Sequence, residues 1–192
     1  MPPKVKVTKK DITDAAVELV RASGAGAINS RAIAARLGCS TQPVFSNFAT
    51  MEELQYATAA AAYEIYTDFL AREVQEGKYP QYKAYGMAYI RFAKEERELF
   101  KLLFMCDREG MDPVSAPDFD ASVEMIMNAN GVSRERATLM HLEMWACVHG
   151  IGTMFATSFL SLEWELISDM LTDIYQGLRE RLLSEVNENG RN

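Results

Sequence analysis

The sequence predicts an all-α protein, and three observations support this fold class. Apolar residues recur three to four positions apart along almost the whole chain, which is the spacing of helices buried on one face. No stretch alternates apolar and polar residues as a half-buried strand would. Glycines interrupt the helical patterns, as at Gly24, Gly38 and Gly131. The 192 residues suffice for about nine helices around a buried core.

Four helices are expected in the first third of the chain, over residues 12–23, 30–37, 41–47 and 51–77. The first three are short, and each carries apolar residues on one face only. Thr50-Met51-Glu52-Glu53 has the pattern of a capping box, in which a threonine and a glutamate three positions later cap a helix start. The fourth helix is therefore expected to begin directly after Thr50.

The second and third helices have the most specific boundaries. Asn29 or Ser30 can cap the second helix. Gly38 supplies the left-handed backbone that a tight turn requires. Ser40 is expected to cap the third helix, which places Pro43 in the first turn, where its missing N–H costs no helical hydrogen bond. Two short helices joined by such a turn form a helix-turn-helix.

The remaining sequence predicts a helical body. Helical patterns cover residues 84–103, 119–130 and 133–158, and a last long helix begins near Ser161. The longest irregular stretch is 107–118. We expect two domains: residues 1–52 as a helix-turn-helix DNA-binding domain, called the head here, and residues 53–192 as a helical ligand-binding and dimerisation domain, called the body.

The charge distribution favours DNA binding by the head. Residues 1–50 hold seven basic and three acidic side chains, a net charge of +4, although the whole chain carries −7. Screening confines electrostatic attraction to about 8–10 Å, so a basic head can dock on phosphates despite an acidic body. The simpler explanation is uneven scatter of charge, and the asymmetry alone is weak support.

The third helix is expected to read bases in the major groove. Val44 and Phe48 lie four positions apart and can pack on Ile33 and Leu37, which turns the opposite face of the helix outward. That face has hydroxyl and amide side chains suited to base edges, while Arg31 and the first turns of the helices suit phosphates. The candidate DNA-binding residues are Asn29, Ser30, Arg31, Ser40, Thr41, Gln42, Pro43, Phe45, Ser46 and Asn47. The alternative, a purely structural helical hairpin, fits this polar and acid-poor face less well.

Seven segments of the chain together form a known pattern: Arg31–Ala34, Leu37–Ser40, Val44-Phe45, Phe48, Glu52–Leu54, Tyr85–Met105 and Trp145–Gly150. In these segments the chain resembles the TetR/AcrR family of bacterial transcriptional regulators, in a subgroup with a Trp-His-Gly signature in its C-terminal domain. The resemblance implies a cytoplasmic, nucleoid-associated protein that acts as a homodimer, paired through its last two long helices, on double-stranded operator DNA.

Three positions depart from the family pattern. Phe45 stands where the family usually has tyrosine, Asn47 where histidine or tyrosine is common, and Met51 where lysine is frequent. The tyrosine and lysine are phosphate partners, so their absence predicts weaker ionic contact and a shallower salt dependence than relatives have.

The body is expected to hold a small effector. Eleven methionines and many aromatic residues suit an adaptable apolar pocket, although any one of them is more often a core residue. His149 is the only ionisable group in its apolar run; such a histidine is more often structural than ligand-binding. The candidate ligand-binding residues are Phe104, Met105, Trp145, His149, Met154 and Phe155.

Enzymatic, metal and cofactor sites are not expected. His141 and His149 lie about 12 Å apart along one helix and cannot share a metal ion. Neither a glycine-rich phosphate loop nor a Gly-x-Ser-x-Gly motif occurs. The three cysteines are scattered, which points to a reducing compartment. There is no apolar run of membrane-spanning length and no secretory signal pattern.

Two functions remain after this comparison. The first is a ligand-responsive repressor that binds a palindromic operator and is released by a small apolar or amphipathic effector. The second is a DNA-binding dimer without a small effector, whose body is a protein-interaction surface. A third function, a helical enzyme whose head plays no part in its activity, is disfavoured by the lack of catalytic motifs. The sequence does not name the effector, the operator or the regulated genes.

Overall fold

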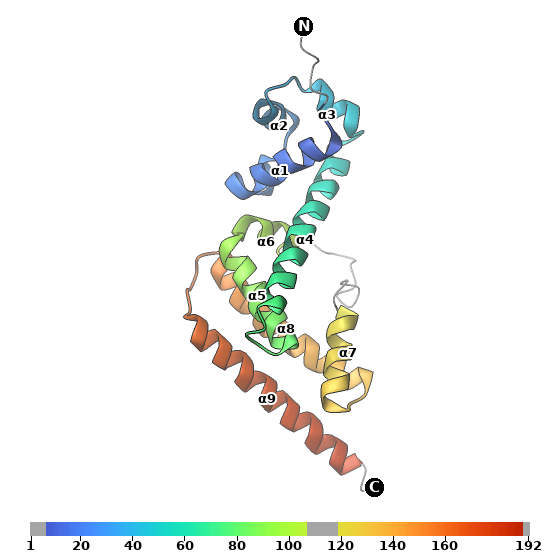
Figure 1. Ribbon diagram of the computed structural model, residues 1–192, viewed down its shortest axis with the longest axis vertical. Helices are drawn as coiled ribbons and strands as arrows, with labels where there is room; N and C mark the ends of the chain where they lie inside the picture. Colours follow the sequence, from blue (N-terminus) through green and yellow to red (C-terminus); the bar gives the residue numbers. More distant parts are fainter. Residues whose placement is uncertain (1–6, 107–118, 190–192) are drawn as a thin grey trace. The chain divides into compact units, whose positions relative to one another are not determined.

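The computed structural model describes residues 7–106 and 119–189, and side chains up to Ser184 in the last helix. The described chain is all-helical and has no strand, so the predicted fold class is confirmed (Figure 1). The predicted irregular stretch 107–118 lies outside the described residues. The elements in order are α1 (Lys9–Ser23), the 3-10 turn η1 (Ala25–Ala27), α2 (Ser30–Leu37), α3 (Gln42–Asn47), α4 (Met51–Gln75), α5 (Gln81–Glu95), α6 (Arg97–Phe104), α7 (Phe119–Asn130), α8 (Arg134–Ala156) and α9 (Trp164–Asn189).

The chain forms two compact units. Unit 1 is Met1–Phe69 with Glu95–Cys106, and unit 2 is Leu70–Lys94 with Asp107–Asn192. α4 contributes residues to both units, and α6 belongs to unit 1 although most of α5 belongs to unit 2. The division into head and body at residues 52 and 53 is a functional division and stays a prediction.

α1 is the central helix of unit 1, because it packs against α2, α3 and α6. Its buried face includes Ile12 and Val20, which are fully enclosed. A capping box fixes its first turn: the Thr8 hydroxyl accepts a hydrogen bond from the Asp11 N–H at 3.1 Å, and the Asp11 carboxylate accepts one from the Thr8 N–H at 2.8 Å. The guanidinium of Arg21 donates two hydrogen bonds, of 2.9 and 2.8 Å, to the carboxylate of Glu96 at the start of α6.

The turn between α2 and α3 has the expected glycine and a different cap. Gly38 adopts the left-handed conformation with φ 63° and ψ 32°, as predicted. The helix cap predicted at Ser40 is wrong, because Thr41 is the N-cap residue of α3 and α3 begins at Gln42. Thr41 has helical dihedral angles and its side chain makes no capping bond. Pro43 still falls in the first turn, where it removes no helical hydrogen bond.

The predicted capping box of α4 is displaced by one residue. The Thr50 hydroxyl accepts a hydrogen bond from the Glu53 N–H at 3.1 Å, as expected. The Glu53 carboxylate accepts from the N–H of Ala49 at 2.8 Å instead of from that of Thr50. The glutamate therefore ties the end of α3 to the start of α4.

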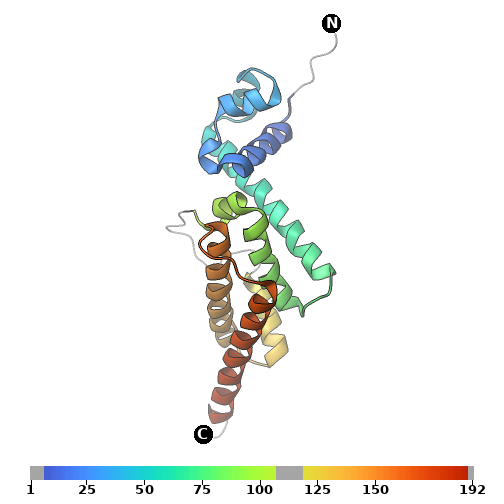
Figure 2. The same ribbon diagram turned by 90° about the vertical axis from the view of Figure 1, so that its left-hand side faces the viewer.

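Unit 2 is built on the pairing of α8 with its neighbours. α7 and α8 form a hairpin around Gly131, and α9 packs along α8 (Figure 2). None of the described helices is both long and apolar enough to cross a lipid bilayer. A buried cluster joins α7, α8 and α9 through Phe119, Val123, Ile126, Val132, Ala137, Met140 and Leu182.

Aromatic and cationic side chains fix the start of α9. The Trp164 ring stacks on Phe155 of α8, with the centroids 6.0 Å apart. The Arg91 guanidinium lies 5.4 Å, and the Lys94 ammonium 5.1 Å, from the centroid of the Trp164 ring. Cations this close to an indole face are attracted by its quadrupole. The first turn of α9 is therefore held by both α5 and α8.

Candidate nucleic-acid interface

α3 is anchored in unit 1 by two buried side chains. Val44 and Phe48 are 1% and 4% exposed, in agreement with the inward face predicted from their spacing. The Lys9 ammonium lies 5.0 Å from the centroid of the Phe48 ring and 2.9 Å from a carboxylate oxygen of Glu53. The Lys9 ammonium, and then the Ala49 N–H, hold the pKa of Glu53 below its ordinary value. Lys9 thus links the first turn of α1 to Phe48 at the end of α3 and to Glu53 in the first turn of α4.

The opposite face of α3 is open to solvent. Gln42, Phe45 and Ser46 are exposed, and Thr41 and Pro43 are partly exposed. The Phe45 ring is 59% exposed, so most of its apolar surface is open to solvent. The face that the sequence assigns to base reading is therefore presented outward within unit 1.

Two of the predicted DNA-binding side chains on α3 are engaged inside the head. The Ser46 hydroxyl donates to the carbonyl of Gln42 at 2.9 Å. The Asn47 amide nitrogen donates to the carbonyl of Pro43 at 2.8 Å and to that of Val7 at 3.5 Å. Asn47 therefore fastens the segment before α1 to the end of α3, and the free donors of this face lie elsewhere.

The free polar groups lie at the start of α3 and of α2. Within residues 7–106 and 119–189, the side chains of Thr41 and Gln42 make no hydrogen bond. Ser40 is exposed in the turn before them, and Ser30 and Arg31 open α2. These five residues and the exposed ring of Phe45 are thus available to a partner.

Most basic side chains of the head are already paired. Among residues 7–52, Arg31 is the one lysine or arginine without a carboxylate within ion-pair distance. A guanidinium without a partner is well suited to a phosphate, which it can bind in a bidentate manner. The paired side chains are Lys9 with Glu53, Lys10 with Asp14, Arg21 with Glu18 and Glu96, and Arg36 with Glu18.

Asn29 caps α2, so its side chain is occupied. Its carbonyl oxygen accepts from the Ala32 N–H at 2.9 Å, and its amide nitrogen donates to the Ala27 carbonyl at 3.1 Å. We expect Asn29→Ala to destabilise the first turn of α2 by about 1 kcal/mol, because that N–H loses its acceptor. Faster hydrogen exchange of α2 amides would show it. Asn29→Asp, which keeps the acceptor, should exchange like the parent, and equal exchange in the alanine variant would contradict the capping role.

The ligand candidates of unit 2 lie partly together on α8. The Trp145 and His149 rings stack with their centroids 5.1 Å apart and their planes 21° apart. The Tyr89 hydroxyl of α5 is hydrogen-bonded to Nδ1 of His149 at 2.8 Å. Trp145 is 42% exposed, so this aromatic group reaches the surface of unit 2.

The other ligand candidates are more dispersed. Phe155 is 2% exposed and packs on Trp164 as a core residue, while Met154, next to it, is partly buried. Phe104 and Met105 belong to unit 1. There the Phe104 ring meets Tyr66 of α4 edge-on, at a centroid distance of 5.0 Å. The structure therefore brings Trp145 and His149 into direct contact, while Phe104 and Met105 lie in the other unit.

Two solved structures share this fold over nearly the whole chain. A protein of unknown function from Rhodococcus sp. RHA1 has 20% sequence identity and a TM-score of 0.67, with coverage of 94% of this chain and 97% of that one. A TetR-like transcriptional regulator from Rhodococcus sp. RHA1 has 17% identity and a TM-score of 0.63, with coverage of 95% and 98%. A search of curated proteins found no match.

The sequence of the body decides the family. Residues 82–173 match the family model described as "Tetracyclin repressor-like, C-terminal domain". These residues form a C-terminal domain of the TetR family. The predicted family is thereby confirmed, and the Trp-His-Gly subgroup stays a prediction.

The sequence interpretation missed both tyrosine–histidine pairs of the body, that of Tyr89 with His149 and that of Tyr82 with His141. The Tyr82 hydroxyl is hydrogen-bonded to Nδ1 of His141 at 2.9 Å, and the Phe119 ring lies edge-on against His141 at 4.9 Å. Burial lowers the pKa of His141 to about 4 and raises that of the Tyr82 phenol. The sequence contained a signal for these pairs. Tyr82 and Tyr89 are seven residues apart on α5, and His141 and His149 are eight residues apart on α8, so two helices packed side by side can bring both pairs together.

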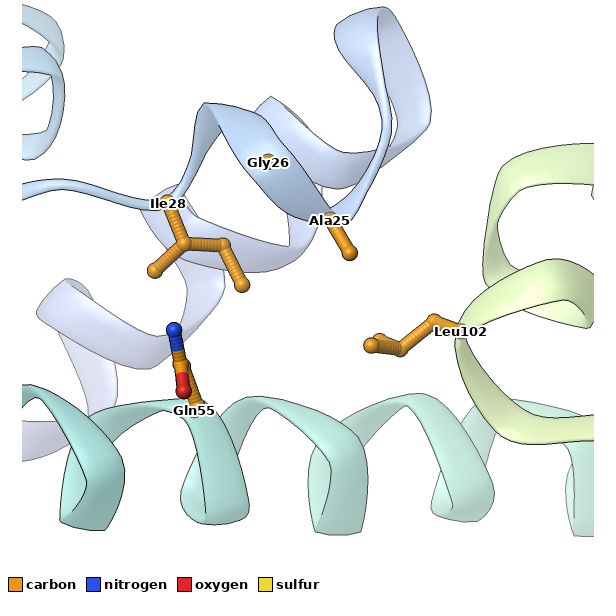
Figure 3. A pocket seen from close by; sticks show the side chains of 5 residues that line it. All are labelled: Ala25, Gly26, Ile28, Gln55 and Leu102. Atoms are coloured by element: carbon orange, nitrogen blue, oxygen red, sulfur yellow. The ribbon is translucent and has the colours of Figure 1, made fainter. Parts of the chain in front are cut away.

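Unit 1 also contains a pocket outside the predicted site. Figure 3 shows Ile28 and Gln55 pointing toward one another and Leu102 of α6 pointing into the same space. Its volume is about 360 Å³, and Ala25 and Gly26 complete the lining. That volume is at the lower end for a small-molecule pocket. None of the predicted ligand residues lines it.

Proposed function

We propose that the chain is a ligand-responsive transcriptional repressor. In this proposal it binds a palindromic operator as a homodimer in the bacterial cytoplasm, on the nucleoid, and a small apolar or amphipathic effector releases it. The observation that carries the DNA-binding part is α3. Buried Val44 and Phe48 hold the helix, and Thr41, Gln42 and Phe45 face outward. The likeness to a TetR-like transcriptional regulator supports the same function.

The proposed DNA contacts divide into two classes. Thr41 and Gln42 read base edges, because their polar groups are unengaged and an amide pairs well with adenine N6 and N7. Arg31 binds phosphate, with support from Ser30, Ser40 and the N–H groups at the start of α2. The side chains of Asn29, Ser46 and Asn47 shape the head, and their contribution to DNA contact is indirect.

The proposed dimer forms through α8 and α9. Leu139 and Leu166 are 52% and 49% exposed, one on each helix, which supports burial against a second copy. A two-fold dimer presents its two recognition helices about 34–36 Å apart, one turn of DNA, and therefore reads an inverted repeat. An effector that changes this spacing weakens operator binding.

The proposed effector site centres on Trp145 and His149. Stacked rings offer an apolar face, and the tyrosine–histidine pair beside them offers polar atoms, a combination that suits an amphipathic molecule. Phe104, Met105, Met154 and Phe155 remain candidates for the rest of the lining. Effector and operator must weaken each other's binding by the same factor. An effector found by thermal-shift screening that leaves operator affinity unchanged would refute this part of the proposal.

One observation favours the alternative function without an effector. Phe159 and Leu160, in the connection between α8 and α9, are 80% and 46% exposed. An exposed apolar pair suits a surface that binds another protein. Phe159→Ser with Leu160→Ser should leave operator binding and effector release intact in the leading proposal. Loss of regulation in this variant, together with no effector response in the parent, would favour the alternative.

The DNA-reading role of Gln42 gives the direct test of the proposed function. Operators are first selected from a pool of random duplexes by the full chain. We expect Gln42→Ala to lose discrimination at one base pair of each half-site, by about 1–3 kcal/mol, because a bidentate pair is lost there. Fluorescence anisotropy on single-base operator variants measures this change. Arg31→Ala is the matched comparison: it should weaken binding to all duplexes alike and reduce the salt slope. If Gln42→Ala kept the parent's preference at every position, the base-reading role would be wrong.

A further inference from the structure

Phe45 is an exposed aromatic ring on the face of α3 that would meet DNA. We infer that Phe45 reads the 5-methyl group of thymine in the major groove, so that recognition by α3 is partly apolar. This inference rests on the proposed DNA-binding function and names the chemistry by which that site selects its sequence. It predicts a thymine at a fixed position in each half-site.

The position of Phe45 separates it from an ordinary surface residue. Gln42 lies three residues before it, so the two side chains are neighbours on one face of the helix. Val44 and Phe48 lie on the other face and are buried. Single exposed apolar residues are common on proteins, but this ring shares its face with the free amide of Gln42. A helix that enters the groove with Gln42 toward the bases brings Phe45 to them as well.

The polar groups of α3 leave few other means of reading sequence. Ser46 and Asn47 donate to backbone carbonyl groups within the head. Thr41 and Gln42 are the polar side chains of this segment that remain unengaged among the described residues. The rest of the exposed face is the Phe45 ring, the engaged Ser46 and part of Pro43. The surface available for contact therefore includes a large apolar side chain beside the free amide of Gln42.

The chemistry of the groove then selects the contact. A phenyl ring has no hydroxyl, so Phe45 cannot donate a hydrogen bond to phosphate or to a base edge. The thymine 5-methyl is the apolar group that the bases present in the major groove. Burying that methyl against a ring removes apolar surface from water on both sides. Phe45 therefore distinguishes thymine from cytosine and from uracil by a group that makes no hydrogen bond.

Deoxyuridine gives a direct test, because it differs from thymidine only by the methyl group. The full chain selects operators from random duplexes, and each thymine of the consensus is then replaced singly by deoxyuridine. We expect a three- to fivefold loss of affinity at one or two positions per half-site, about the value of one buried methyl. Fluorescence anisotropy at fixed salt measures these affinities.

Two variants make the assignment specific. Phe45→Ala should bind thymine and uracil operators equally at those positions, and circular dichroism should show an unchanged fold because the ring is exposed. Ser46→Ala, an exposed neighbour on the same helix, should keep the parent's sensitivity to the methyl group. A random-pool selection repeated with Phe45→Ala should also lose the preference for thymine there.

The outcomes separate this inference from the function on which it rests. A clear consensus with no sensitivity to deoxyuridine would overturn methyl reading and leave DNA binding standing. Sensitivity that persists in Phe45→Ala would assign the methyl to another residue and equally overturn the role of Phe45. If the full chain selected no consensus at all, the proposed function itself would fail, and the inference with it.

Discussion

Phe48→Ala is expected to lower the free energy of unfolding of the head by about 3–5 kcal/mol and to abolish specific DNA binding. The Phe48 ring is 4% exposed, and its removal leaves a cavity at the end of α3. The Lys9 ammonium also loses the ring face that it covers. With α3 no longer held at a fixed angle, Thr41 and Gln42 cannot be presented together to a groove.

Phe45→Ala is the matched control for the stability measurement, because it makes the same chemical change on the same helix. The Phe45 ring is 59% exposed, so its loss should alter stability by less than about 0.5 kcal/mol. Hydrogen exchange of amides in α1, α2 and α3 measures the stability of the head directly. Both tryptophans, Trp145 and Trp164, lie in unit 2, so their fluorescence reports the other unit. Equal protection of the head in both variants would show that Phe48 does not hold α3.

The second large effect is a loss of stability in unit 2 at acidic pH. Burial lowers the pKa of His141 from 6.5 to about 4, so the folded state favours the neutral imidazole. Stability from this source is complete above pH 6.5 and is lost as the pH falls toward 4. Allowing for partial solvent contact, the loss amounts to about 2 kcal/mol between pH 7 and pH 4.5. The hydrogen bond to Tyr82 and the contact with Phe119 would be disrupted together.

Comparison with His141→Gln isolates this contribution. Glutamine does not titrate and can still hydrogen-bond to the Tyr82 hydroxyl. Urea unfolding followed by tryptophan fluorescence at pH 7, 5.5 and 4.5 gives the stability of each protein. Carboxylates titrate in both proteins, so the difference between their pH profiles reports His141. Parallel profiles would mean that His141 has the same pKa in the folded and unfolded states, which would contradict the effect of its burial.

The head was largely predictable from the sequence because its determinants are local. The left-handed conformation of Gly38 and the place of Pro43 follow from residue types at fixed spacing. The spacing of Val44 and Phe48 likewise fixed which face of α3 is buried. The cap of α3 was predicted one residue too early, at Ser40 instead of Thr41, because helix ends have the weakest local signals.

The sequence did not show which polar side chains of the head are engaged in internal hydrogen bonds. The sequence offered Asn29, Ser46 and Asn47 as DNA contacts, and the structure engages all three in hydrogen bonds within the head. Asn47 in particular bonds to the carbonyl of Val7, forty residues earlier. Such a bond depends on how α1 lies against α3. Because these donors are occupied, the exposed ring of Phe45 becomes a main candidate for contact with DNA.

The sequence alone determined the helical fold class, the helix-turn-helix and the resemblance of the body to its family, since each depends on periodicity or on residues close together in the chain. Only the tertiary structure decided that α6 packs with α1, that Tyr82 and Tyr89 each meet a histidine of α8, and that Arg31 is left unpaired among the described basic residues of the head. These features join residues far apart in sequence. The packing of whole helices determines which of these residues meet, and the spacing of residues along the chain does not encode that packing.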